Sequence, residues 1–309
     1  MEIKKIWVCG IGGVGGYFGG RLVYEIQKQS AKDVNVYFLA RGDHLKEIKH
    51  KGLELHTSDG KQITCNPTIA SDNVKAFPHP DICFICVKNY DLNGLIDIIE
   101  NKLSLETIII PLMNGIDIYD RIRIKLKKCI VFPTCVYVGS HIERSGLVIQ
   151  NGNEGFFCCG PDPIHPEFNP NNLISFFKKI KINMQWKDDP YPIIWEKYLL
   201  VASFALVCTY TGQAFGGVLD DPKNTNLLKD VMREIVTIAE KKGIILPSNI
   251  IEKTIIFCKD YPDIKPSYMR DVEKGRKNEG DLFGGAIIRM GQELGVPTPV
   301  TESIYKKRS

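Results

Sequence analysis

Three glycines near the N-terminus have the spacing of a phosphate-binding turn. Gly10, Gly12 and Gly15 follow an apolar segment, residues 6–9, and precede a stretch of helical character. A helix N-terminus directs backbone N–H groups at an anion, so this arrangement suits the pyrophosphate of a dinucleotide. We expect Gly10 to permit the tight turn, Gly12 to let the phosphates approach, and Gly15 to let helix and strand pack closely. The other residues of this predicted cofactor site are Ile11, Gly13 and Val14. The alternative is a glycine-rich turn in another α/β fold.

The residues after the next predicted strand, Val34–Leu39, indicate which dinucleotide binds. NAD sites usually carry Asp or Glu at that place, where the carboxylate holds the ribose 2′-hydroxyl. This chain has Ala40 and then Arg41. A guanidinium pairs with a 2′-phosphate, which a carboxylate would repel, so we expect NADP(H). The alternative for Arg41 is an ordinary solvated charge at a strand end.

Hydride transfer from a nicotinamide to a ketone also requires a proton donor for the developing alkoxide. None of the six histidines lies beyond residue 165, which favours another donor in the second half of the chain. Lys197 is the last cation before a long uncharged run. At the edge of an apolar cleft its pKa would be lowered toward the working pH, and its ammonium could protonate an alkoxide. The alternative is a lysine that extends from the helix start into water.

A second polar cluster lies nearer the C-terminus. It contains Ser267, Asp271 and Glu279. We expect Ser267 to cap the helix that follows it. Glu279 is expected to pair with Lys197 or to hold a substrate hydroxyl, and its alternative is a solvated surface carboxylate.

Strands and helices alternate in the first half of the chain, which predicts a parallel, doubly wound sheet. The predicted strands are Lys5–Cys9, Val34–Leu39, Ile82–Val87, Thr107–Pro111 and Cys129–Pro133, and helices are predicted at Val14–Gln29 and Leu92–Leu103. Three later segments, 136–139, 146–150 and 155–160, are expected to be short antiparallel strands added to this sheet.

From residue 192 onward the periodicity is helical. Helices are predicted at Ile193–Tyr210, Asn226–Lys242, Ser248–Lys259 and Val272–Leu294, the last broken near Gly275–Gly285. The pattern breaks at residues 187–192, which predicts a dinucleotide-binding domain, residues 1–188, and an all-helical substrate domain, residues 189–309. A cleft between such domains is the expected substrate site.

Composition excludes several other classes of protein. The 309 residues are 44% hydrophobic and 25% charged with a net charge of +4, as in a soluble globular protein. The basic run Arg121–Lys128 alternates with aliphatics, which predicts a helix with one wet face rather than a nucleic-acid surface. We expect no signal peptide, because the chain opens with a core strand, and no stretch of about 20 apolar residues that would span a bilayer.

The ten cysteines are scattered, and most stand in apolar runs. Cys83 and Cys86 have redox or zinc spacing, but they lie within a predicted buried strand, where residues three apart point to opposite faces. We therefore expect buried thiols, no metal site and a cytoplasmic location.

Together these motifs resemble the ketopantoate reductase (2-dehydropantoate 2-reductase) family along nearly the whole chain. The matching residues are Gly10–Gly16, Arg41, Val87-Lys88, Met113-Asn114-Gly115, Trp195-Glu196-Lys197, Ser267, Asp271 and Glu279. The resemblance implies an N-terminal Rossmann-type doubly wound sheet and an all-α C-terminal domain like that of 6-phosphogluconate dehydrogenases. It also implies NADPH-dependent reduction of ketopantoate to (R)-pantoate on the pathway to coenzyme A. Monomers and homodimers are both compatible with it.

The resemblance implies a role for each matching side chain. Lys197 corresponds to the general acid, Glu279 to the partner of the substrate hydroxyl, and Ser267 to a contact of the substrate carboxylate. Lys88 and Asn114 correspond to residues near the nicotinamide and its ribose, and Asn114 also belongs to the expected substrate site. A cationic acid suits an anionic keto acid, both as proton donor and as counter-charge.

The chain departs from the family pattern on the helix that carries the lysine. Val201 and Ala205 stand where the family commonly has asparagine, and losing such a contact costs about 1–3 kcal/mol. Two alternatives therefore stay open. The chain reduces another small 2-keto acid, or a 2-keto ester or lactone, or it binds NADP without catalysis as a sensor or partner. The presence of Lys197 and Glu279 argues against the second alternative.

Overall fold

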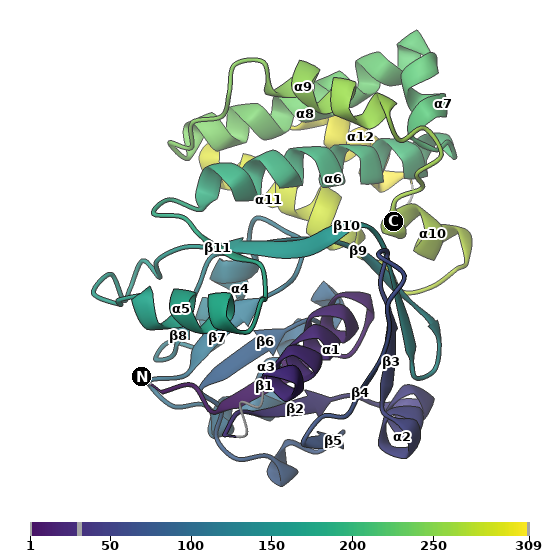
Figure 1. Cartoon of the computed structure of the whole chain (residues 1–309). Helices are drawn as coiled ribbons and strands as arrows, with labels where there is room; N and C mark the ends of the chain where they lie inside the picture. The colour runs from purple at the N-terminus through teal and green to yellow at the C-terminus, as the bar shows by residue number, and fades with distance from the viewer. Residues whose placement is uncertain (1, 30–32, 308–309) are drawn as a thin grey trace. The chain divides into compact units, whose positions relative to one another are not determined.

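The computed structural model describes residues 2–29 and 33–307, and the chain divides into two compact units (Figure 1). The first unit comprises Met1–Met113 and Ile118–Pro190. The second comprises Asn114–Asp117 and Tyr191–Ser309. A four-residue segment in the middle of the chain therefore belongs to the C-terminal unit.

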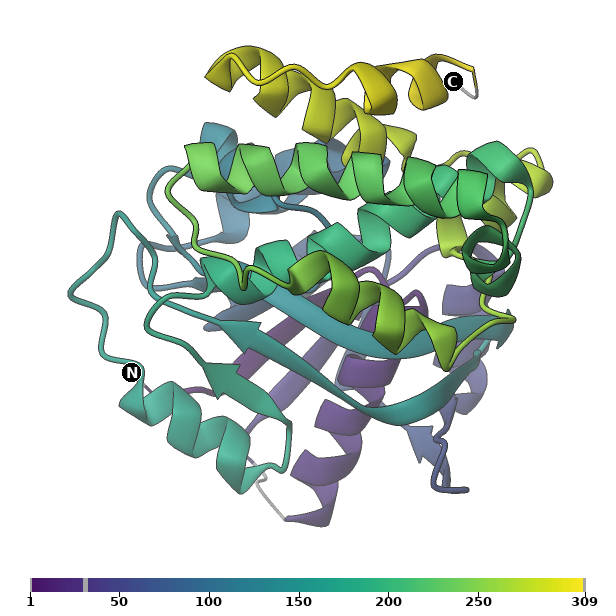
Figure 2. The same ribbon diagram turned by 90° about the horizontal axis from the view of Figure 1, so that it is seen from above.

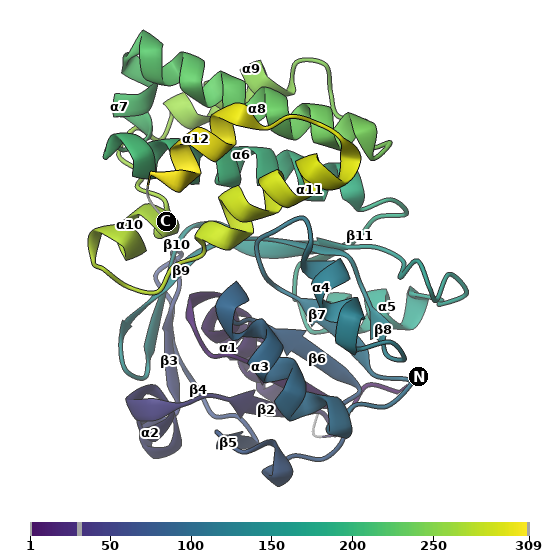
Figure 3. The ribbon, with the colours of Figure 1, turned by 180° about the vertical axis from the view of Figure 1, so that it is seen from behind.

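A six-stranded parallel sheet forms the centre of the first unit, in the order β5-β2-β1-β6-β7-β8. Its strands are β1 (Lys5–Cys9), β2 (Asn35–Leu39), β5 (Ile69–Ser71), β6 (Ile82–Ile85), β7 (Ile108–Pro111) and β8 (Ile130–Val131). The strands β6 and β7 are buried along their whole length, because helices cover both faces of the sheet. Helix α1 (Gly13–Lys28) lies on one face, and α3 (Asn89–Ile99) and α4 (Ile118–Lys125) lie on the other (Figures 1 and 3). The predicted doubly wound sheet is confirmed.

A second sheet of the first unit was not predicted. Its order is β11-β10-β3-β4, with β9 paired to β10. The strands are β3 (Leu53–His56), β4 (Gln62–Cys65), β9 (Thr134–Arg144), β10 (Leu147–Cys159) and β11 (Met184–Trp186), and helices α2 (Gly42–Lys51) and α5 (Asn171–Lys179) complete the unit. The predicted antiparallel pairing of these segments is confirmed, but the expectation of three short strands added to the first sheet is wrong, because the segments form two long strands of a separate sheet (Figure 2).

The polar stretch that suggested a break in this region is a bulge inside β10. The register of β9 against β10 shifts between Asn151 and Phe156. The carboxamide of buried Gln150 donates to the carbonyl oxygens of Asn151 and Asn153 at 2.9 and 2.8 Å, and accepts from the Ser58 N–H at 3.0 Å. These bonds satisfy backbone groups that the bulge removes from the ladder, so the strand continues through polar residues.

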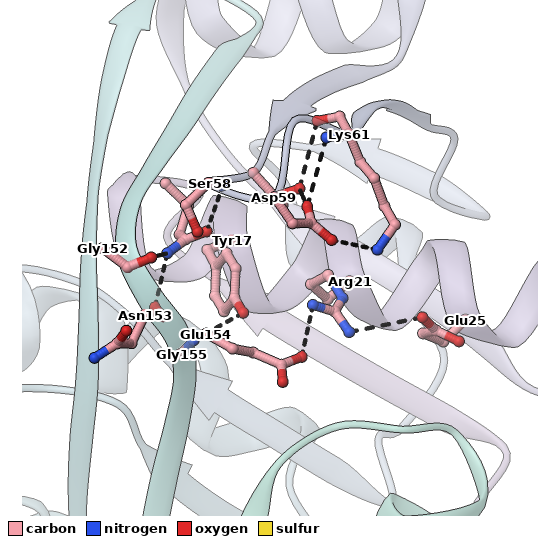
Figure 4. Close-up of polar contacts among 12 residues, drawn as sticks. Tyr17, Arg21, Glu25, Ser58, Asp59, Lys61, Gly152, Asn153, Glu154 and Gly155 are labelled. Carbon is pink, nitrogen blue, oxygen red and sulfur yellow. Dashed lines mark hydrogen bonds and ion pairs between the residues drawn. The ribbon is translucent and has the colours of Figure 1, made fainter.

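Helix α1 packs on both sheets, and small residues allow the close approach. A Cβ built on Gly155 would lie 2.5 Å from Cε1 of Tyr17, whose hydroxyl accepts a hydrogen bond from the Gly155 N–H at 2.9 Å. In the same region Arg21 of α1 lies between Glu25 and Glu154 (Figure 4). These contacts hold the β10 bulge against the middle of α1.

The second unit is built from helices around the long, apolar helix α6. Its helices are α6 (Tyr191–Thr211), α7 (Phe215–Asp220), α8 (Pro222–Lys241), α9 (Ile250–Lys259), α10 (Ser267–Glu273), α11 (Ala286–Leu294) and α12 (Pro299–Lys306). α6 packs against α8, α10 and α12. Helix α8 begins four residues earlier than predicted, because Asp221 caps it and Pro222 suits its first position.

The helix predicted over 272–294 is broken near Gly275–Gly285, as expected: α10 ends at Glu273, and a π-helical turn, Asp281–Gly285, precedes α11. One expectation about this unit is wrong, because α6 has the length and hydropathy of a membrane span, which we did not expect of any segment. Since 67% of its apolar window is buried, the apolar character of α6 is that of a core helix.

Candidate functional site

The glycine loop of the first unit has the geometry that a pyrophosphate site requires. Gly10 has φ +95°, a conformation that L side chains rarely adopt. A Cβ on Gly15 would lie 1.9 Å from the Gly10 carbonyl oxygen, so glycine is needed there for packing. A Cβ on Gly12 would meet none of the described atoms within 4 Å. Gly12 precedes α1, whose first turn has no acidic residue, so the open space lies beside the electropositive end of a helix and fits an anion.

Two further glycines of the loop allow it to pack closely against the second sheet. A Cβ on Gly13 would lie 2.4 Å from the carbonyl oxygen of Ser140 on β9, and one on Gly16 would lie 2.5 Å from Cγ2 of Val148 on β10. Sequence reasoning assigned Gly13 to the cofactor loop alone. The packing constraint was invisible without the second sheet.

The ends of two neighbouring parallel strands meet at the glycine loop. A Cβ on Gly10 would lie 2.9 Å from the carbonyl oxygen of Cys86, directly after β6. Lys88 follows and is the residue before the first turn of α3. The order of the sheet reverses between β1 and β6, and ligands of such folds bind at that point. Lys88 therefore lies on the loop where a dinucleotide is expected.

Arg41 stands directly before α2, two residues beyond the end of β2. Its side chain is 81% exposed, and Nη2 contacts Oδ2 of Asp91 at 2.7 Å. Asp91 lies in the first turn of α3, 50 residues away in sequence, and no sequence signal connects the two. Exposed ion pairs of this kind are worth little, so a phosphate can compete with Asp91 for the guanidinium.

In the second unit, Lys197 is bound rather than extended into water. Its half-buried Nζ donates a hydrogen bond to Oδ1 of Asn114 at 2.8 Å, across 83 residues of sequence. Asn114 comes three residues after β7 ends, and the next residue, Gly115, turns the chain with φ +121°. The fold thus joins two residues that the sequence suggested separately.

Glu279 is only 5% exposed, so its interpretation as a solvated surface carboxylate is wrong. Its carbonyl oxygen accepts a hydrogen bond from the N–H of Leu282 at 2.9 Å, at the entry to the π-helical turn. Turns of this type occur often at functional sites.

Ser267 is the first residue of α10, and Pro266 occupies the capping position. The predicted capping role of Ser267 is therefore wrong. Pro266 has an extended ψ of 150° and a φ of −54° close to its ring-restricted value, so the helix starts directly after it. On α6, Val201 is half-buried and Ala205 is buried, one and two turns after Lys197.

Two family models match the chain. "Ketopantoate reductase PanE/ApbA" matches residues 6–161, and "Ketopantoate reductase PanE/ApbA C terminal" matches residues 191–307. The chain belongs to the ketopantoate reductase family.

Individual proteins that resemble this chain are distant in sequence but similar along their whole length. An uncharacterized oxidoreductase, YkpB of Bacillus subtilis (strain 168), is 27% identical over 97% of this chain and 96% of its own. A PanE/ApbA family ketopantoate reductase from Ralstonia eutropha JMP134 has 24% identity and a TM-score of 0.87, covering 98% of this chain and 96% of its own. A D-mandelate dehydrogenase, solved with NADH and anilino(oxo)acetate, has 20% identity and a TM-score of 0.82, covering 98% and 96%.

As a ketopantoate reductase family member, the chain is an oxidoreductase that uses a pyridine nucleotide and acts on small molecules. The glycine loop fits the diphosphate of such a cofactor, because Gly12 leaves open space beside the helix N-terminus. All ten cysteines are buried thiols, so the Cys83–Cys86 spacing reflects a core strand, as predicted.

Proposed function

We propose that this ketopantoate reductase family member reduces 2-dehydropantoate to (R)-pantoate with NADPH. The reaction would serve pantothenate and coenzyme A biosynthesis in the cytoplasm. The observation that carries the proposal is the hydrogen bond from Lys197 Nζ to Asn114 Oδ1 at 2.8 Å. A proton donor must be held at a defined place, and an amide oxygen orients an ammonium without removing its proton.

Lys197 is the proposed general acid. When bound, NADPH supplies the hydride that adds to the keto carbon. Lys197 gives one proton to the keto oxygen as that oxygen gains negative charge, so the ketone becomes an alcohol. The ammonium also offsets the charge of the substrate carboxylate, and solvent returns the proton afterwards.

Glu279 and Ser267 are the proposed substrate-orienting residues. The Glu279 carboxylate accepts a hydrogen bond from the substrate hydroxyl, and its burial makes an unpaired substrate hydroxyl costly. The Ser267 hydroxyl donates a hydrogen bond to the substrate carboxylate. The amide of Asn114 would serve both the lysine and the cofactor ribose, with Lys88 near the nicotinamide.

The proposed preference for NADPH rests on Arg41. Its exposed guanidinium stands at the end of β2, where a ribose 2′-phosphate would lie. A phosphate carries more charge than the Asp91 carboxylate and takes two parallel N–H bonds, so it would displace that carboxylate.

A second candidate function is reduction of a 2-keto acid with a larger apolar group. Val201, one turn after Lys197 on the same face of α6, places only methyl groups at a half-buried position, and Ala205 one turn further is buried. The Val201 side chain offers no hydrogen bond to a hydroxyl, and an apolar substituent would pack on it better. The D-mandelate dehydrogenase with the same fold, solved with anilino(oxo)acetate, is compatible with such a substrate class.

One assay tests both candidates. NADPH oxidation is followed with 2-dehydropantoate, with aliphatic and aryl 2-keto acids, and with NADH as the control cofactor. Selective turnover of 2-dehydropantoate supports the first proposal. Turnover of only aryl or other apolar keto acids supports the second, and NADPH binding without any turnover would contradict both.

A further inference from the structure

The residue that follows Lys197 forms a contact that the proposed chemistry does not explain. The hydroxyl of Tyr198, a side chain only 1% exposed, donates to the carbonyl oxygens of Leu282 and Phe283 at 2.9 and 2.8 Å. Both carbonyls belong to the π-turn, Asp281–Gly285. One helix therefore bears the proposed acid and, one residue later, a hydrogen-bond donor to the turn that follows Glu279.

The π-turn is contacted from outside its own backbone. The Ala286 N–H reaches back five residues to the Asp281 carbonyl oxygen, so the turn is wider than an α-helical one. Small residues line it: a Cβ on Gly280 would lie 2.9 Å from the Tyr268 hydroxyl, and one on Gly284 would lie 2.6 Å from the Tyr305 ring. The turn thus packs tightly against two tyrosines, and a side chain at Gly280 or Gly284 would not fit.

A second bond connects the π-turn with the segment that contains Asn114. Arg289 on α11 pairs with Asp281, the first residue of the turn, and its Nη2 lies 3.4 Å from Oδ2 of Asp117. Since Asn114–Asp117 also receives the Lys197 bond, the contacts form a closed ring within the second unit. The ring joins this segment, α6 and the turn.

From this ring we infer that Tyr198 is a positioning residue for Glu279, fixing the π-turn so that the carboxylate meets the substrate. The inference rests on the proposed role of Glu279. Tyr198 touches no reacting atom in this scheme. Tyr198 affects substrate binding indirectly, because it holds the backbone of residues 279–283 in place.

The first experiment is a double-mutant cycle between Tyr198→Phe and Glu279→Gln. Tyr198→Phe removes one hydroxyl and leaves two buried carbonyls without that donor. We expect it to raise the KM for the keto acid about tenfold, a value that corresponds to the loss of one such hydrogen bond. The kcat should change much less, and NADPH affinity should not change. In the Glu279→Gln background, Tyr198→Phe should have almost no further effect on KM.

The chain offers a matched control in Tyr17→Phe. Tyr17 is also buried, and its hydroxyl also bonds the backbone, accepting a hydrogen bond from the Gly155 N–H in the other unit. Its loss should lower stability comparably and leave the KM for the keto acid unchanged. Equal KM increases for Tyr198→Phe with and without the Glu279 carboxylate would overturn the inference, because Tyr198 would then act independently of Glu279.

Amide hydrogen exchange without substrate separates this inference from the proposed function. Tyr198→Phe should accelerate exchange in residues 279–287, and Tyr17→Phe should accelerate it only around Gly155. Unchanged exchange at 279–287 would overturn the positioning role even in an active enzyme. If no keto acid is reduced but exchange accelerates as expected, the link between Tyr198 and the turn stands, and only the proposed reaction fails.

Discussion

The glycine loop and the lysine cluster are built in opposite ways. The loop uses consecutive residues, Gly10–Gly16, and offers an anion its backbone N–H groups. The lysine cluster, which we define as Lys197, Asn114, Asp117 and Arg289, uses side chains from distant parts of the sequence. Hydrogen bonds and ion pairs join them. A backbone site of this kind depends on local geometry, and a side-chain site depends on how helices pack. Variants should therefore affect binding in the first region and chemistry in the second.

Lys197→Ala should have the largest effect, because it removes the proposed general acid. We expect turnover to fall by about 10²–10⁴ with little loss of stability. Steady-state kinetics with thermal unfolding measure both quantities. Lys253→Ala, at an exposed position on α9, is the control and should remain fully active. Near-normal turnover of Lys197→Ala would assign this lysine a purely structural role.

Arg41→Ala tests whether the first region also uses a side chain. The loss of a charged hydrogen bond, about 1.5–3 kcal/mol, should weaken NADPH binding roughly ten- to a hundredfold and NADH binding much less. Titration of both cofactors by fluorescence or calorimetry measures the difference. Lys46→Ala, an exposed cation on α2, is the control. Equal losses for both cofactors would contradict recognition of the 2′-phosphate.

Two substitutions within the loop separate cofactor contact from packing. Gly15→Ala should lower the free energy of unfolding by about 1–3 kcal/mol, because its Cβ would collide with the Gly10 carbonyl. Gly12→Ala should leave stability nearly unchanged and weaken cofactor binding, since its Cβ would enter the open space beside the helix. Chemical denaturation and cofactor titration of the pair give four values. A stability loss in Gly12→Ala as large as that in Gly15→Ala would refute this division of roles.

His44 on α2 is expected to give the smallest effect. Its Nδ1 accepts a hydrogen bond from the Gly146 N–H at 3.0 Å, and burial lowers its pKa below the usual 6.5, opposed by the backbone of Ile11. Since the unfolded chain then binds a proton more readily, this contribution to stability is present above about pH 6.5 and is lost as the pH falls toward the folded-state pKa. His44→Asn keeps an acceptor but does not titrate, so its stability should depend less on pH in that range. Parallel curves of unfolding free energy against pH would contradict this assignment.

Local signals predicted most of the first sheet and failed for the second. The apolar runs of β1, β6 and β7 are continuous and bounded by turns, so their burial was predictable. The long strand β10 contains a polar bulge whose backbone groups bond the Gln150 side chain, which in turn accepts from the Ser58 N–H. The short strand β4 pairs with β3 across a short turn, and β3 joins the sheet through the distant β10, a long-range pairing that periodicity does not report.

The residues of the candidate site also differ in how far local sequence signals could predict them. Arg41 could be proposed because a strand end and a glycine loop define its place relative to a dinucleotide. Asp91, Tyr198 and Arg289 could not, because their roles consist of contacts with residues on other elements. Glu279 was proposed from the polar cluster near the C-terminus and from the resemblance, and its burial became visible only in the structure.

By itself, then, the sequence determined the doubly wound sheet and the helical second half, and it proposed the glycine loop as the cofactor site and Lys197 as the acid. The tertiary structure decided that Asn114 belongs to the helical unit and binds Lys197, and that a π-turn follows Glu279. The physical reason is the distance along the chain over which each interaction acts. Backbone conformation and hydrophobic periodicity depend on a few consecutive residues, so they can be predicted from the sequence. Side-chain hydrogen bonds between elements depend on packing angles that arise only when the whole unit has folded.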